Sequence, residues 1–192
     1  MKNNDLILAI YKDKRTVFRL IEIAMLVGET NFQSLNKKLN YYVRTGRLQN
    51  PRRGVYAKSD YNSLELGCSI FSPAYISLEY VLQKSGIIFQ YDSRITAVSY
   101  LSRSIIVAEQ KYQFRKIKAE ILVNTVGIIR KENHTNIASV ERAFLDLLYL
   151  NRNCYFDNIS GLDIQKVYKL LPIYQSIALS ERVNKLWKNN GY

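Results

Sequence analysis

Apolar residues recur at helical spacing in three segments of the first 45 residues. Residues 6–11 predict a first helix, and residues 16–18 are typical of a short strand. The mostly apolar run 20–27 ends at Gly28, which predicts a second, buried helix. The polar residues 29–31 then form a turn before the next periodic segment.

The segment from Phe32 to Thr45 predicts a third helix with two different sides, capped by Thr30 or Asn31. Apolar positions fall on one side, at Phe32, Leu35, Leu39, Tyr42 and Val43. The opposite side carries Gln33, Ser34, Lys37, Tyr41 and Arg44, with Lys38 at its margin. Amide, hydroxyl and cationic groups in this arrangement can reach base edges and phosphates in a major groove.

Residues 46–57 predict a short hairpin in which Asn50-Pro51 is the turn signal between two strands. Arg52 and Arg53 are therefore expected near the tip, where together with Arg47 they can contact phosphate or enter a minor groove. Three helices followed by a basic hairpin are typical of a winged helix-turn-helix. Residues 1–60 are predicted to form such a DNA-binding domain.

Residues 61–192 mix β-rich and helical patterns. The expected elements are a helix from Pro73 to Gly86, strands at 87–89, 95–101, 112–123 and 126–130, and helices that start at Ser139, Asp163 and Ile177. Strands in the middle with helices around them predict a small mixed α+β domain. The fold class expected for the whole chain is α+β.

Charge supports a nucleic-acid partner. The 28 Lys and Arg residues exceed the 16 Asp and Glu residues by 12, and such a surplus favours polyanions. Residues 1–60 hold 12 basic and 5 acidic residues, and residues 31–58 hold seven basic and no acidic ones. This acid-free block coincides with the third helix and the hairpin, so double-stranded DNA is the predicted partner.

Composition also indicates a compartment. No apolar run approaches the roughly 18 residues of a membrane span, and the N-terminus does not resemble a signal peptide. Cys68 and Cys154 lie far apart and lack a C-x-x-C partner, which favours free thiols in a reducing cytoplasm. We therefore expect a cytoplasmic protein without a membrane partner.

The sequence offers few candidates for catalysis. It lacks the common nucleotide-binding, hydrolase and metalloprotease motifs, and with one histidine, His134, a Cys/His metal site has almost no ligands. No cofactor, metal or enzymatic activity is expected. Two alternatives stay open: a Mg²⁺-dependent nuclease using Asp92, Glu109 and Lys111, and a winged helix that docks a protein.

Three blocks of the sequence resemble the AbiEi antitoxins of AbiE-type (type IV) toxin–antitoxin systems. The first, LNYYVRTGRLQNPRRGVYA, contains Arg53-Gly54-Val55-Tyr56, a sequence typical of the end of the wing in that family. The second is SPAYISLEYVLQKSGII, and the third is ASVERAFLDLLYL, with Arg142 and Asp146 in an Arg-Ala-x-x-Asp pattern. Residues 94–134 match no part of the family pattern.

The resemblance implies a winged-helix autorepressor that binds inverted repeats in its own promoter. It also implies that the C-terminal half neutralises a co-encoded nucleotidyltransferase toxin, with which the antitoxin need not form a stable complex. On the resemblance alone, Arg142 and Asp146 belong to the antitoxin surface. Their spacing by itself favours an ordinary i,i+4 ion pair on one helix, worth a few tenths of a kcal/mol.

Overall fold

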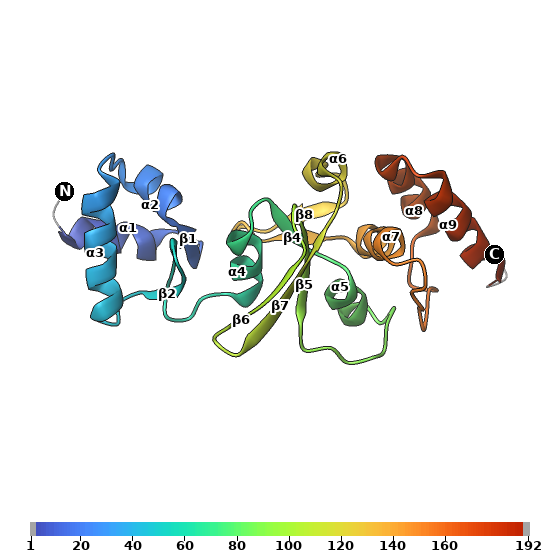
Figure 1. Ribbon diagram of the computed structural model, residues 1–192, viewed down its shortest axis with the longest axis horizontal. Coiled ribbons are helices and arrows are strands. Elements are labelled where there is room, and N and C mark those ends of the chain that lie inside the picture. The colour runs from blue at the N-terminus through green and yellow to red at the C-terminus, as the bar shows by residue number, and fades with distance from the viewer. Residues whose placement is uncertain (1–2, 190–192) are drawn as a thin grey trace.

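The computed structural model describes residues 3–189, and its elements follow one another along the long axis of the molecule (Figure 1). An N-terminal unit, residues 3–58, occupies one end. Its elements are α1 (Asn3–Lys12), β1 (Val17–Arg19), α2 (Leu20–Val27), α3 (Phe32–Arg44), β2 (Gln49–Arg52) and β3 (Val55–Ala57). The strands form an antiparallel sheet in the order β1-β3-β2.

The C-terminal unit, residues 63–189, contains a second sheet with helices around it. Its elements are α4 (Ser63–Ile70), β4 (Ala74–Ile76), α5 (Glu79–Lys84), β5 (Ile95–Ser99), β6 (Arg103–Val107), β7 (Gln110–Lys116), α6 (Ala119–Val123), β8 (Ile128–Arg130), β9 (Asn136–Ala138), α7 (Val140–Leu150), α8 (Ile164–Leu170), the 3₁₀ turn η1 (Leu171–Tyr174) and α9 (Ile177–Asn189). The six strands are ordered β6-β7-β5-β4-β9-β8, and the chain is therefore a mixed α+β protein.

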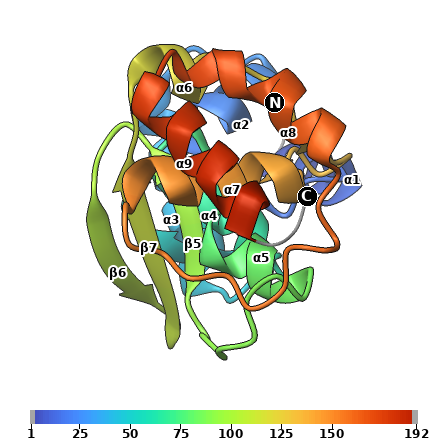
Figure 2. The same ribbon diagram turned by 90° about the vertical axis from the view of Figure 1, so that its right-hand side faces the viewer.

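Helix α7 is the central helix of the C-terminal unit. Ser139 caps it by accepting the Arg142 N–H through its hydroxyl at 3.2 Å, as its sequence position predicts. Every residue from Glu141 to Leu148 is buried, because neighbouring elements surround the helix. Figure 2, seen along the long axis, shows α7 with α9 crossing in front of it.

The sheet of the N-terminal unit lies between two hydrophobic cores. Phe18 and Tyr56 point into the core formed with α1, α2 and α3. Their neighbours Val17, Val55 and Ala57 belong to the larger core of the C-terminal unit. Alternate residues of a strand point to opposite faces, so β3 and most of β1 are buried from both sides, and these two strands join the two units.

Several predicted boundaries differ from the structure. A helix is predicted from Pro73, but residues 74–76 form strand β4 and the helix begins only at Glu79. All three residues of β4 are buried between β5 and β9, so pairing and burial in the sheet decide their conformation.

The strand predicted at 87–89 is absent from the described backbone. There the N–H of Ile87 bonds to Leu82 at the end of α5, and its carbonyl accepts the N–H of Asp157 at 3.0 Å. The strand predicted over 112–123 ends at Lys116, and α6 begins at Ala119. Strands β6 and β9 were not predicted.

The helices have limited length. None in the described range 3–189 is long and apolar enough to cross a lipid bilayer.

Candidate nucleic-acid interface

Helix α3 is fixed by its cap and by its apolar side. The side-chain oxygen of Asn31 accepts the Ser34 N–H at 2.9 Å, as predicted for an N-cap. Leu35, Leu39 and Tyr42 are buried in the core of the N-terminal unit. This packing turns the opposite side of the helix outward at the end of the molecule (Figure 1).

The outward side of α3 presents most of the predicted contact residues. Gln33, Lys37 and Arg44 are exposed to solvent, and 47% of the surface of Tyr41 is exposed as well. Ser34 is half-buried at the start of the helix. The helix contains no acidic residue, so this side carries only neutral and positive groups.

Lys38 has a partner already. Its Nζ lies 3.7 Å from a carboxylate oxygen of Glu29, which precedes the helix. The backbone N–H of Asn31 donates to Glu29 as well and lowers the pKa of that carboxyl. Lys38 is therefore less available to a phosphate than Lys37 is.

Two asparagines on α3 were missed in the prediction. Asn40 is exposed and lies seven residues after Gln33 and three after Lys37, a helical spacing that could have identified it. Asn36 accepts the hydroxyl of Tyr56 at 2.6 Å and so connects α3 to the small sheet.

The hairpin turns at a different place from the one predicted. Arg52 pairs with Val55, so Arg53 and Gly54 form the turn, and Gly54 adopts a φ of 77°, which suits glycine. Asn50-Pro51 lies within β2, where the register shifts. The side-chain amide of Asn50 donates to the carbonyls of Arg52 and Val55 at 2.9 and 2.8 Å and stabilises this arrangement.

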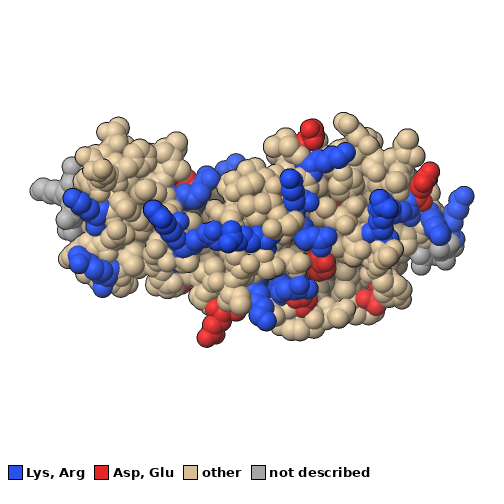
Figure 3. Space-filling view, in the orientation of Figure 1, with Lys and Arg blue, Asp and Glu red and all other residues tan. Residues whose placement is uncertain are grey.

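The arginines of the hairpin region have unequal surroundings. Arg53 and Arg47 are exposed, whereas Arg52 is half-buried. The Cζ atom of Arg52 lies 4.7 Å above the ring of Phe71, which belongs to the C-terminal unit. Figure 3 shows Lys and Arg side chains in a band that runs from the N-terminal unit across the middle of the molecule.

Arg142 and Asp146 do not lie on a surface, which corrects the expectation drawn for them. Both side chains are 0% exposed, and the Nε of Arg142 lies 3.4 Å from Asp146. Asp146 also accepts the hydroxyls of Ser77 at 2.8 Å and Tyr174 at 2.7 Å. The Arg-Ala-x-x-Asp pattern therefore marks a buried polar network.

This network joins several elements of the C-terminal unit. The guanidinium of Arg142 donates to the carbonyls of Val126 at 3.0 Å and Ile121 at 2.7 Å, and to the hydroxyl of Tyr75 at 3.3 Å. Burial raises the pKa of Asp146, while Arg142 and the hydroxyl donors oppose that rise. The arrangement is that of a structural ion pair.

The three residues of the alternative nuclease pattern, Asp92, Glu109 and Lys111, do not form a shared metal site in the structure. Both oxygens of Asp92 accept the Nε of Arg94, at 3.0 and 2.8 Å, and the pKa of Asp92 is lowered mainly by this contact. Glu109 lies in the turn before β7 with a φ of 67°, while Lys111 is exposed on that strand. Within residues 3–189, no group of three or more His, Cys, Asp or Glu side chains could hold a metal ion.

Cys68 and Cys154 are free, as predicted. Burial raises the pKa of each thiol to about 11, so both are protonated near neutral pH. His134 is exposed in the loop between β8 and β9. Comparison with models of protein families and with curated proteins finds no match to this chain.

Proposed function

We propose that the N-terminal unit is a winged helix-turn-helix that binds double-stranded DNA, with α3 in the major groove and the hairpin at the phosphate backbone. The observation that carries this proposal is the outward side of α3, where Gln33, Lys37, Tyr41 and Arg44 are exposed and no acid is present. Groups of this kind bind base edges and phosphates. The net charge of +12 adds a general attraction to DNA.

The wider proposal is that the chain acts in the cytoplasm as an autorepressor and antitoxin of the AbiEi type. It would bind inverted repeats in its own promoter and counter a co-encoded nucleotidyltransferase toxin. The support for this part is the resemblance of the three sequence blocks. Arg53-Gly54-Val55-Tyr56 supplies the hairpin turn and the strand between the two cores, and Arg142 and Asp146 supply the buried network.

A gel-shift titration with the DNA upstream of the gene tests the role of α3. Lys37→Gln and Arg44→Gln each remove one exposed cation from its outward side. If each contacts one phosphate, the slope of log K against log salt falls in magnitude by about 0.9 per variant. Lys185→Gln and Arg152→Gln are matched controls, because both side chains are exposed in the C-terminal unit. Equal binding by all four variants and the wild type would exclude α3 as the reading helix.

The hairpin is tested by replacing its two arginines. The double variant Arg52→Ala with Arg53→Ala is expected to abolish most binding to the same DNA. The single variants separate two effects: Arg53→Ala should weaken binding without changing stability, while Arg52→Ala also loses its contact with Phe71. Wild-type binding by the double variant contradicts the placement of the hairpin at the DNA.

The antitoxin part has its own readout. Cells that express the neighbouring nucleotidyltransferase gene should stop growing, and co-expression of this chain should restore their growth. The Arg52→Ala, Arg53→Ala double variant should restore growth as well. Failure of the wild type to restore growth contradicts the antitoxin role and leaves DNA binding unaffected. The two parts of the proposal can therefore fail separately.

A further inference from the structure

A cavity of about 560 Å³ lies where the two units meet. Strand β1 and the start of α2 line it from the N-terminal unit, and α4, β4 and the segment 122–136 line it from the C-terminal unit. The volume is within the range of roughly 300–1,000 Å³ that small-molecule sites have in proteins.

The charges that line this cavity are not balanced. Three arginines, Arg15, Arg19 and Arg130, face two glutamates, Glu22 and Glu65. Glu22 is paired with Arg19 at 3.1 Å, and Glu65 accepts two backbone N–H groups, of Thr16 and Val17, both at 2.8 Å. Both carboxylates also act electrostatically on Arg15, and neither forms an ion pair with Arg130.

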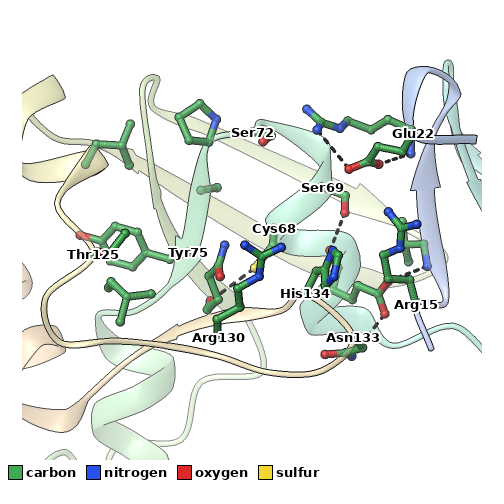
Figure 4. A pocket seen from close by; sticks show the side chains of 18 of the residues that line it. Arg15, Glu22, Cys68, Ser69, Ser72, Tyr75, Thr125, Arg130, Asn133 and His134 are labelled. Atoms are coloured by element: carbon green, nitrogen blue, oxygen red, sulfur yellow. Dashed lines mark hydrogen bonds and ion pairs between the residues drawn. The ribbon is translucent and has the colours of Figure 1, made fainter. Parts of the chain in front are cut away.

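Arg130 is the cation that remains without a partner. Its guanidinium makes no ion pair or hydrogen bond with any residue of the described range 3–189, whereas Arg15 is paired with Asp13 at 2.7 Å. Figure 4 shows Arg130 and His134 among the side chains that line the cavity, with Tyr75 and Thr125 to their left in this view and Arg15 to their right. An unpaired guanidinium is suited to a phosphate group.

The rest of the lining is suited to an organic group. Pro73, Leu122 and Ile128 supply apolar surface, and Thr125 and Asn136 supply hydrogen-bonding groups. We propose that this cavity binds a small phosphorylated molecule, whose phosphate contacts Arg130 and whose organic part lies against the C-terminal unit. This site is distinct from the outward side of α3 and does not depend on DNA binding.

Isothermal titration calorimetry and thermal unfolding of the full chain test the site, with inorganic phosphate and adenosine 5′-monophosphate as probes at equal ionic strength. Both should bind the wild type and raise its melting temperature, more strongly for the nucleotide if the organic part contributes. Arg130→Gln should weaken binding at least about tenfold, because a charge-assisted hydrogen bond is lost. Arg130 is exposed, so this variant should fold normally.

Arg152→Gln is the matched control, since this exposed arginine does not line the cavity. It should bind both probes as the wild type does. The proposal is overturned if the wild type binds neither probe. It is also overturned if Arg130→Gln binds the probes as tightly as the wild type does. If Arg130→Gln weakens DNA binding while the wild type binds neither probe, Arg130 contacts DNA phosphate instead and the proposal is also overturned.

Discussion

The carboxylate of Glu65 accepts the backbone N–H of Thr16 at 2.8 Å and the hydroxyl of the same residue at 2.7 Å. Glu65 belongs to α4 of the C-terminal unit, and Thr16 immediately precedes β1 of the N-terminal unit. The same carboxylate accepts the N–H of Val17 and the side-chain amide of Asn133. Burial raises the pKa of Glu65, while these donors oppose the rise. One buried side chain thus connects the small sheet to the rest of the molecule.

Replacement of Glu65 by alanine should destabilise the protein by about 2–4 kcal/mol, because buried N–H groups of Thr16 and Val17 lose their acceptor. Urea unfolding measures the change. Glu132→Ala is the matched control: Glu132 also pairs across the two units, with Lys14 at 2.7 Å, but both side chains are largely exposed. Loss of this exposed ion pair should lower the free energy of unfolding by less than about 1 kcal/mol. Equal effects of the two variants would contradict a special role of Glu65.

The buried pair of Arg142 and Asp146 should behave differently from a surface ion pair. Asp146→Leu leaves the guanidinium of Arg142 without its acid in the interior, which should cost about 3–5 kcal/mol. The double variant Arg142→Met with Asp146→Leu removes both charges and should be more stable than the sum of the single changes predicts. A double-mutant cycle from urea unfolding measures this coupling. Strict additivity would mean that the two side chains do not interact.

The ionisation of Asp13, which lies near the boundary between the units, should make the free energy of unfolding depend on pH. The side-chain hydrogen bond from Arg15 lowers the pKa of Asp13 below its ordinary value of 3.8, although burial opposes this. The folded state therefore favours the ionised form. Its contribution to stability is complete above about pH 5 and is lost as the pH falls through the lowered pKa.

Urea unfolding of the wild type and Asp13→Asn between pH 3 and pH 7 checks this sign. The difference in the free energy of unfolding should grow as the pH rises and then remain constant. In the Arg15→Gln background the same comparison should lose most of its pH dependence, because the partner of Asp13 is absent. A difference that grows toward acid pH would contradict the assignment.

Local sequence determined the elements whose signals do not depend on distant residues. The periodicity of α3, its cap at Asn31 and the cap of α7 at Ser139 all appear in the structure as expected. The outward placement of Gln33, Lys37, Tyr41 and Arg44 also follows from that periodicity. A helix divides its residues between two sides by spacing alone, so these positions were predictable.

The tertiary structure decided the features that depend on distant segments, because the spacing of residues along the chain does not show which distant segments will bury them. Residues 74–76 have a helical pattern but are a central strand, and Arg142 and Asp146 have the spacing of a surface pair but lie in the core. The place of the hairpin turn was set by the pairing of Arg52 with Val55. The sequence by itself determined which side of α3 faces outward. Only the fold determined how the two units are joined, since Glu65 and Thr16 lie 49 residues apart.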